Sequence, residues 1–275
     1  MRIFSGWPGL LCLLLPLPAH AMGTELVLGV HPDQPIRTLI AMHEPLATHL
    51  RLELGRPVRL VSAKNSLLFG QRLLKGDYEL ALAPAHQARL AQKDHGWHPL
   101  ARPRDPVPVY LLARKTDTGS TPDDLKRKVL AVADRNMLLT LAGERWLEQH
   151  HQLGEGDYTK LVTGGDASAV DAVVTGRADM ALATSTGLER VRDEQRRQLR
   201  VIKEILSIPQ MVFVARHDIT PQDRAALQRA LLAYRSPARV QLVAMGTGDL
   251  AAMDPYLPQT RSRLQTSGSP RSPRP

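Results

Sequence analysis

The sequence predicts an α/β chain of two similar lobes that are joined by a pair of strands. Short apolar runs alternate with amphipathic segments, as strands and helices do in parallel sheets that are covered on both faces. Two kinds of segment also occur twice, once in each half of the chain. A repeated unit on either side of a crossing segment indicates two lobes.

The first repeated segment reads LLKGDYELALAPAH at 73–86 and VVTGRADMALATST at 173–186. Both copies have a glycine suited to a helix end, then an acidic residue, then the apolar run Ala-Leu-Ala. Each copy is therefore interpreted as the third strand unit of its own lobe, and each strand runs into a polar loop.

The second repeated segment reads PVYLLARKTDTGSTPDDL at 108–125 and QMVFVARHDITPQDRAAL at 210–227. Both copies have an apolar strand, an Ala-Arg pair and then a Thr-Pro helix start. They are the expected crossing strands, with hinges near 107–112 and 206–212.

This division predicts that lobe 1 contains residues 22–107 and 211–258, and that lobe 2 contains residues 108–210. The alternative is one continuous doubly wound sheet, in which the apolar runs 25–30 and 178–183 would lie together.

The remaining elements follow from the alternation of patterns. Strands are expected over 25–30, 57–63, 78–83, 128–133, 158–163 and 178–183. Helices are expected over 36–55, 66–76, 85–92, 138–151 and 166–176, and from about 187. Pro45 inside the first helix predicts a break or a kink.

Residues 1–21 have the pattern of a signal peptide. Arg2 is followed by an apolar stretch at 10–17 and by the small-x-small sequence Ala19-His20-Ala21. The stretch is shorter than a membrane-spanning helix requires. We therefore expect cleavage after Ala21 and a periplasmic location. The single cysteine, Cys12, lies inside this segment, so the mature chain would have no disulfide.

The chain carries 36 Lys and Arg against 27 Asp and Glu, and part of this excess is concentrated at the C-terminus. Residues 259–275 contain four arginines, no acid and many Ser and Pro, so they are expected to form a disordered basic tail. Weak attraction to anionic lipid or to a partner is the alternative role. With 4% aromatic residues and no binding motif, the chain is not expected to bind nucleic acid.

Polar residues stand where the predicted parallel strands end, which is where such sheets bind ligands. The expected ligand-binding residues are His31, Asn65, Ser66, His86, Tyr110, Asn136, Asp166, Ser168, Thr184 and Ser185. Several of them precede helices, where free N–H groups attract anions, and the alternative for each Ser, Thr, Asp or Asn is a simple helix cap. Convergence of the whole set on one cleft favours binding.

Catalysis and metal binding have little support in the sequence. The glycines of TGGDAS at 163–168 lack a P-loop lysine, and the hydroxyls of TSTG at 184–187 have no evident base. His31 and His86 could face each other, but no acid or cysteine stands at a ligand spacing beside them. No catalytic residue, metal or cofactor is therefore assigned.

From residue 22 to about 258 the chain resembles the phosphonate-type (PhnD-like) periplasmic substrate-binding proteins that feed ABC importers. The resemblance lies in GVHP at 29–32, the segment 73–86, VYLLARKTD at 109–117, TPDDLKRKVLAVAD at 121–134, TGGDASAVDAVVTGRADMALA at 163–183 and IPQMVFVARHDIT at 208–220. It implies the type II, Venus-flytrap architecture of periplasmic binding proteins, with a two-strand hinge and closure around a small solute.

The chain also departs from the pattern of that family. Where the family has a Ser-Thr-Ser-type cluster that holds phosphonate oxygens, this chain has Met137, Leu138 and Leu139. The family's histidine aligns with Asp166, and an acidic ligand contact aligns near Thr184 and Ser185. Tyr110 is kept, but Leu111 and Leu112 follow it in place of the family's polar pair. Either these changes favour a less charged solute, or the three apolar residues are helix core and backbone alone binds the anion.

The expected function is that of a monomeric solute-binding protein that delivers a phosphonate-like or related solute to an ABC permease. The alternative is a periplasmic sensor or accessory protein that reuses the fold without transport and works with a membrane sensor, since fold alone does not fix function.

Overall fold

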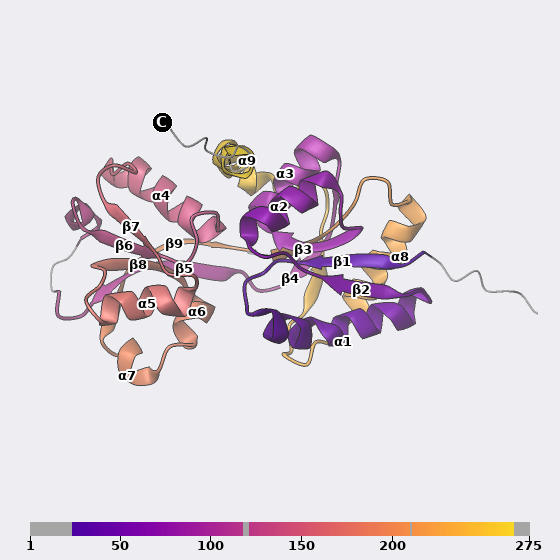
Figure 1. The fold of residues 1–275 in the computed structure, drawn as a ribbon, viewed down its shortest axis with the longest axis horizontal. Coiled ribbons are helices and arrows are strands. Elements are labelled where there is room, and N and C mark those ends of the chain that lie inside the picture. The colour runs from indigo at the N-terminus through magenta and orange to yellow at the C-terminus, as the bar shows by residue number, and fades with distance from the viewer. Residues whose placement is uncertain (1–23, 118–120, 210, 267–275) are drawn as a thin grey trace, which may run out of the picture.

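The computed structural model describes residues 24–117, 121–209 and 211–266, which form two α/β lobes lying side by side (Figure 1). Strand β1 (Leu26–Val30) and strand β8 (Met180–Thr184) belong to different sheets, so the alternative of one continuous sheet is wrong.

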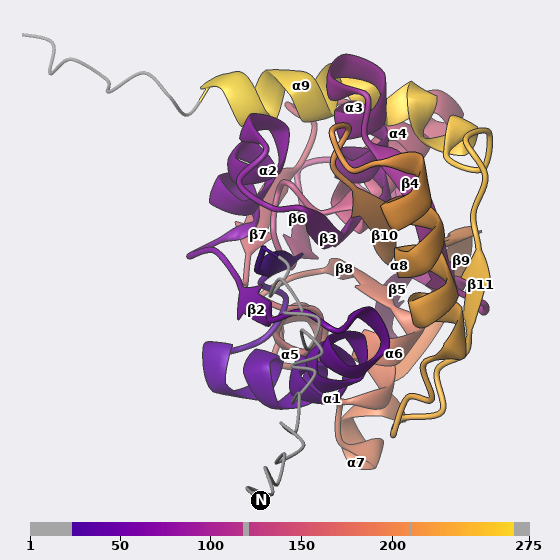
Figure 2. The same cartoon turned by 90° about the vertical axis from the view of Figure 1, so that its right-hand side faces the viewer.

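Lobe 1 is built on a six-stranded sheet with the order β11-β4-β10-β3-β1-β2. Its other strands are β2 (Val58–Val61), β3 (Leu80–Pro84), β4 (His98–Pro103), β10 (Met211–Ala215) and β11 (Leu242–Ala244). Its helices are α1 (Ile36–Leu54), α2 (Ser66–Lys75), α3 (Ala85–His95), α8 (Pro221–Ala233) and the 3-10 helix η2 (Ala251–Tyr256). Helices α1 and α8 cover one face of the sheet, and α2, α3 and η2 cover the other, with a separate apolar cluster on each face (Figure 2).

Lobe 2 is built on a five-stranded sheet with the order β7-β6-β8-β5-β9. Its other strands are β5 (Val107–Arg114), β6 (Val129–Val132), β7 (Thr159–Val162) and β9 (Leu199–Ile208). Its helices are the 3-10 helix η1 (Pro122–Leu125), α4 (Leu138–His151), α5 (Asp166–Val174), α6 (Ser185–Glu189) and α7 (Asp193–Arg196). Helices α4 and α5 pack on opposite faces of this sheet.

The chain passes between the lobes twice, from β4 to β5 and from β9 to β10 (Figure 1). Strand β5 begins beside the carboxyl end of β8, where Val109 pairs with Thr184, and β10 begins beside the carboxyl end of β3, where Met211 pairs with Pro84. Each crossing strand therefore runs antiparallel to its neighbour. The expectation of parallel sheets is wrong for these strands and correct for β1, β2 and β3 and for β6, β7 and β8.

The repeated acidic residue has the same structural task in both lobes. Glu79 Oε2 accepts a hydrogen bond from the backbone N–H of Val27 at 2.9 Å, and Asp179 Oδ2 accepts one from that of Val129 at 2.9 Å. Each acid thereby ties the turn before the third strand to the first strand of its lobe. The glycine of each copy, Gly76 or Gly176, has a positive φ of 84° or 74°, which an L side chain rarely adopts.

The repeated arginine also has an equivalent task in each lobe. Arg114 donates from Nη1 to the carbonyl oxygens of Val173 and Ala178, and Arg216 donates from Nη1 to that of Gly76. In each lobe, the arginine that follows the apolar part of the crossing strand therefore binds the helix end or the turn that precedes the third strand. The two repeats in the sequence meet in space.

Two local expectations are wrong. Helix α1 runs through Pro45 without the expected break, and Leu39, Leu46 and Leu50 on either side of the proline are buried in the core of lobe 1. Residues 259–266 are not disordered, since they belong to helix α9 (Leu257–Thr266), whose Leu257 and Leu264 pack against Leu90 of lobe 1. The signal segment 1–21 and the tail residues 267–275 lie outside the described residues.

Within the described ranges, no helix combines the length and the apolar character that crossing a membrane requires.

Candidate functional site

A cluster of buried polar side chains stands at the carboxyl ends of the parallel strands of lobe 1. His31 follows β1, Ser66 begins α2, and His86 and Gln87 lie in the first turn of α3, directly after β3. All four side chains are buried. His31 Nε2 lies 2.9 Å from Ser66 Oγ, and Gln87 Nε2 donates to the same oxygen at 3.4 Å. The structure therefore brings the predicted residues His31, Ser66 and His86 together at one buried edge of the sheet, and Gln87 belongs to the same cluster.

Both histidines of this cluster are held in the neutral form. Burial, together with the nearby His86, lowers the pKa of His31 to about 3. Burial, assisted by Arg263, lowers the pKa of His86 to about 4, although its bond to the Asn136 carbonyl acts in the opposite direction. A neutral imidazole has one donor nitrogen and one acceptor nitrogen, so neither ring offers a cation to an anionic ligand at neutral pH.

The bond between His86 and Asn136 joins the two lobes. His86 Nε2 lies 3.0 Å from the carbonyl oxygen of Asn136, which can only accept, so Nε2 carries the proton. The other ring nitrogen, Nδ1, is then an acceptor, and it is buried without a hydrogen-bond partner among the described residues. Asn136 takes part in this bond through its backbone carbonyl oxygen.

Asp166 and Thr184 form the matching polar pair in lobe 2. Asp166 Oδ2 accepts from the backbone N–H of Thr184 at 3.1 Å and from its hydroxyl at 2.5 Å. Thr184 Oγ1 in turn accepts from the N–H of Gly187 and so caps α6. The second carboxylate oxygen, Asp166 Oδ1, is buried and has no partner in the described part of the chain. One carboxylate oxygen of Asp166 is therefore bonded within lobe 2, and the other is available to accept a hydrogen bond from a ligand.

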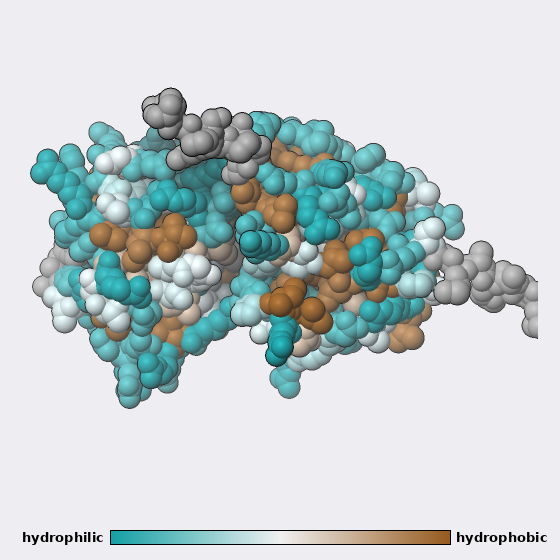
Figure 3. Space-filling view, viewed as in Figure 1, coloured by the Kyte–Doolittle hydropathy of each residue, from teal (hydrophilic) through white to brown (hydrophobic). Residues whose placement is uncertain are grey.

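Charged groups of the two lobes also face one another. The carboxyl pKa of Asp33, just after β1, is raised chiefly by desolvation and further by Asp166, while Arg190 of lobe 2 acts to lower it. The residues at the end of β1 in lobe 1 therefore lie near the start of α5 and the end of α6 in lobe 2. Figure 3 shows the notch between the lobes on the side where α1 faces α5 and α6 in Figure 1.

Asp134 forms hydrogen bonds that hold the loop before α4. Asp134 Oδ1 accepts from the backbone N–H of Asn136 at 2.7 Å, and the Thr140 hydroxyl donates to the Asp134 carbonyl at 2.8 Å. Asn136 precedes Met137, the N-cap residue of α4, so its bond to Asp134 holds the loop before the helix. The carboxylate of Asp134 places a negative charge beside the helix start, which disfavours a dianion there.

The three apolar residues at this helix start divide between the lobes. Met137 and Leu139 pack in the core of lobe 2. Leu138 belongs instead to the apolar cluster of lobe 1 that contains Phe69, Val212 and Met253. The alternative that all three are core of one helix is thus correct for two of them, and Leu138 is an apolar contact between the lobes.

Four predicted residues lie outside the polar clusters. Asn65 is an exposed helix cap whose Oδ1 accepts from the N–H of Leu68 at 2.8 Å. Ser168 is exposed on the outer side of lobe 2 in a hollow shared with Val162 and Arg177. Tyr110 is half-buried against the α5-side core of lobe 2, and Ser185 is half-buried at the start of α6. The cap interpretation is therefore correct for Asn65.

Sequence reasoning missed Gln87, Arg190 and Arg263. Gln87 is adjacent to His86 in the first turn after β3, which is a signal that the sequence contained. Arg190 and Arg263 are two of many arginines, and only the packing of the lobes brings them to the site.

Among the described residues, no group of three or more His, Cys, Asp or Glu side chains could hold a metal ion. The polar groups described above are hydrogen-bond donors and acceptors, and they come from both lobes.

Comparison with known proteins identifies the family of this chain. Residues 28–255 match the family described as "ABC transporter, phosphonate, periplasmic substrate-binding protein". Comparison with the curated proteins gives no match.

Solved structures of this architecture share the fold at low sequence identity. They include a binding protein component of an ABC phosphonate transporter from Pseudomonas aeruginosa (TM-score 0.71, 16% identity, covering 88% of this chain and 89% of that one). PhnD1 from Prochlorococcus marinus in complex with methylphosphonate has a TM-score of 0.71 and 12% identity, covering 87% and 98% of the two chains. A Xanthomonas citri protein bound to ATP has a TM-score of 0.72 and 14% identity, covering 88% and 99%. With the family match spanning most of its length, the chain belongs to the periplasmic substrate-binding proteins of phosphonate-type ABC transporters.

Proposed function

We propose that this chain binds a small solute between its two lobes, in the periplasm, and delivers it as a monomer to the permease of an ABC importer. Family membership supports the general role, since substrate-binding proteins of ABC importers deliver solutes to a membrane permease. The signal pattern that ends at Ala21 supports export.

One observation carries the location and the chemistry of the site. His86 Nδ1 in lobe 1 and Asp166 Oδ1 in lobe 2 are both buried acceptors without partners. Buried polar groups are normally hydrogen-bonded, and an unpaired one costs free energy that a bound ligand can recover. A solute that supplies donors to both acceptors would bind the lobes together.

The two unpaired acceptors also limit the chemical class of the solute. A phosphonate dianion has acceptors only, so it cannot donate to these two acceptors, and it would also meet the carboxylates of Asp33, Asp134 and Asp166. The two arginines near the site are already engaged, since Arg190 interacts with Asp33 and Arg263 pairs with Glu144. We infer that the solute carries donor groups, such as an amine or hydroxyls, and that any phosphonate-like group it has is accompanied by them. Burying an uncompensated anion beside these carboxylates would be costly.

Calorimetry on the chain from residue 22 tests this proposal. The panel consists of methylphosphonate, 2-aminoethylphosphonate, phosphate, phosphite, alkylamines and carboxylates. We expect a donor-bearing member to bind, and we expect Asp166→Asn to weaken it by about 10-fold or more, as loss of a charged hydrogen bond would. Ser168→Ala, at an exposed serine of the same helix, is the matched control and leaves the affinity unchanged.

Two results would overturn parts of the proposal. Submicromolar binding of methylphosphonate that Asp166→Asn leaves unchanged would show that the donor requirement is wrong. Failure of every panel member to bind, combined with normal solute uptake in cells that lack the chain, would favour the sensor or accessory role.

A further inference from the structure

An apolar cavity of about 450 Å³ lies in lobe 1 under the first half of α1. This volume is in the range of small-molecule sites. Its walls come from α1, from the ends of β1, β3 and β10, and from the segment between α8 and β11. The apolar wall residues are Val30, Ala41, Met42, Pro45, Leu46, Leu82, Pro103, Met211, Phe213, Tyr234, Pro237, Ala238, Val240 and Leu242.

The cavity borders the buried polar cluster at His31. This residue lines the cavity, and the same ring is bonded to Ser66 in the buried polar cluster. Its Nδ1 is buried and without a partner among the described residues. Asp33, which interacts with Asp166 and Arg190 of lobe 2, stands in the same wall. A molecule in the cavity would therefore touch the edge of the site between the lobes.

The mouth of the cavity leaves large apolar side chains in water. Met42 is 50% exposed and Val240 is 43% exposed, and Ala41, Pro45, Pro237 and Ala238 beside them are also exposed. Hydrophobic side chains gather on lobe 1 over α1, next to the notch between the lobes (Figure 3). A concentrated apolar surface of this kind marks a binding site.

The polar residues in the cavity wall do not favour a charged head group inside the cavity. His43 is half-buried, and burial lowers its pKa, so it is neutral at pH 7. The remaining polar wall residues are His31, Asp33 and Ser236, and none of them is a cation at that pH. An anion would find no counter-charge in the wall, whereas hydrocarbon would be well accommodated.

We propose that this cavity binds a hydrocarbon group, an alkyl chain or an aromatic ring, of the solute whose polar end lies at His31 between the lobes. The proposal rests on the proposed function and extends it to an amphipathic class of solute. Binding displaces water from the apolar wall, and the length of the hydrocarbon group sets the affinity.

The first experiment tests the cavity without any head group. The uncharged fluorophore N-phenyl-1-naphthylamine is titrated into the chain from residue 22 and into two variants of the same helix. We expect saturable binding that Met42→Glu weakens by about 10-fold or more, because the variant places a carboxylate at the cavity mouth. Leu52→Glu is the matched control, since Leu52 is 78% exposed on α1 and does not line the cavity. Circular dichroism checks that both variants fold.

The second experiment measures affinity along two series of probes, the n-alkylphosphonates and the n-alkylamines from methyl to octyl. Each added CH₂ that enters the cavity is expected to raise affinity by about fourfold. The increase is expected to disappear in Met42→Glu and to persist in Leu52→Glu.

The possible failures are distinguishable. Binding of the short members without any gain from chain length would overturn the cavity proposal and leave the proposed function standing. Fluorophore binding that is absent, or equal in both variants, would also overturn it. If the fluorophore binds as expected and neither series binds, the assignment of the cavity to a part of the solute is overturned, and the wider panel and the uptake measurement decide the proposed function.

Discussion

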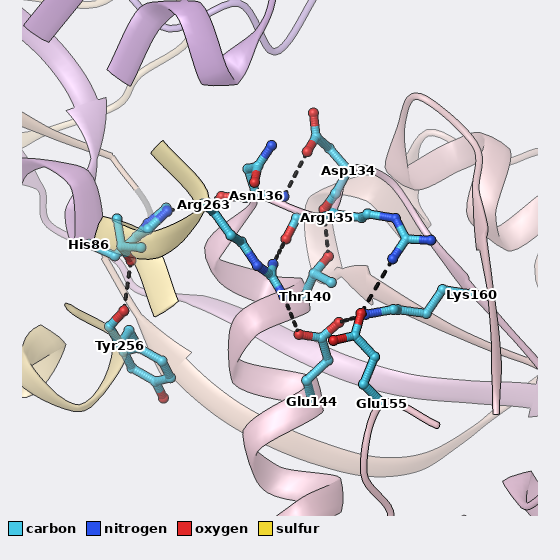
Figure 4. A network of polar contacts seen from close by, with 11 residues as sticks. His86, Asp134, Arg135, Asn136, Thr140, Glu144, Glu155, Lys160, Tyr256 and Arg263 are labelled. Atoms are coloured by element: carbon cyan, nitrogen blue, oxygen red, sulfur yellow. Dashed lines mark hydrogen bonds and ion pairs between the residues drawn. The ribbon is translucent and has the colours of Figure 1, made fainter. Parts of the chain in front are cut away.

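Arg263, in the last helix of the described chain, donates from Nη2 to Glu144 Oε2 in lobe 2 at 2.7 Å (Figure 4). The same guanidinium donates to the carbonyl oxygen of Arg135. Glu144 is also paired with Lys160 at 2.7 Å, and Lys160 in turn with Glu155 (Figure 4). The helix itself rests on lobe 1, where Gln71 Nε2 donates to the Leu264 carbonyl and Arg261 pairs with Asp94. Helix α9 therefore connects the two lobes at a place that neither crossing strand occupies.

We expect Arg263→Gln to loosen this connection. The side chains of Arg263 and Glu144 are mostly buried, and loss of such a charged hydrogen bond is expected to cost about 2 kcal/mol of unfolding free energy. Small-angle scattering of the ligand-free variant is expected to show a larger radius of gyration than the parent chain, because the lobes separate more easily. Gln265→Ala, at an exposed position of the same helix, is the control. Equal scattering curves for Arg263→Gln and the parent would contradict the prediction.

Gly187→Ala is expected to disrupt the lobe 2 half of the site. A Cβ at Gly187 would lie 2.3 Å from Asp166 Cβ and 2.6 Å from its Oδ2, so Asp166 must move away from Thr184. Overpacking of this kind costs about 1–3 kcal/mol, which urea unfolding would measure, and calorimetry should show weaker solute binding. Gly156→Ala places its Cβ in open space and is the control. An unchanged affinity in Gly187→Ala would remove Asp166 from the site.

The two buried histidines predict a loss of stability in mild acid. Their pKa values of about 3 and about 4 in the folded chain lie below the ordinary value of 6.5, so the unfolded chain binds more protons as the pH falls. Their contribution is fully present above pH 6.5 and is lost progressively toward pH 4. At pH 5 each would cost about 2 kcal/mol relative to pH 7. Urea unfolding at the two pH values measures this difference.

His86→Gln is expected to reduce that dependence on pH, because the glutamine does not titrate. His150→Gln, at an exposed position near the end of α4, is the control. If both variants lose as much stability as the parent between pH 7 and pH 5, the buried His86 is not the cause.

The repeated acids predict equal and independent losses in the two lobes. Glu79→Ala and Asp179→Ala each remove one acceptor from a backbone N–H of the first strand, and each is expected to cost about 1–2 kcal/mol. The double variant should show the sum of both losses, since the two bonds lie in different sheets. Thermal unfolding measures all three, with Glu53→Ala on the exposed face of α1 as the control. A double variant no less stable than either single variant would contradict this.

The internal repeats made the architecture predictable. The alternation of apolar runs with helices gives strands and helices that local pattern determines, and α4 spans the residues expected for it, 138–151. No strand was expected at β11 or at β4, and His98–Pro103 contains two prolines, which local pattern does not favour in a strand. Pairing with β10 and β11 makes it a strand, and local pattern does not contain that information.

The site was less predictable than the fold. A position after a parallel strand identifies candidates, and His31, Ser66, His86, Asp166 and Thr184 all make buried polar contacts. Which of two roles a Ser, Thr or Asn has depends on where its side chain points, and that separates Asn65, a cap, from Ser66. The composition of residues 259–275 predicted disorder around Arg263. The first part of this segment is helical because Leu257 and Leu264 of α9 pack against the apolar surface of lobe 1.

The family match ends at residue 255, and the helix that fastens one lobe to the other begins at Leu257. The stretch that matches the family and the helix that holds the two lobes together are thus consecutive but separate in the sequence. Two relatives with identical binding residues would differ in how readily they open if only their final turns differed. Exchange of the last ten described residues between such relatives would transfer the opening equilibrium from one to the other and leave the solute-binding residues untouched.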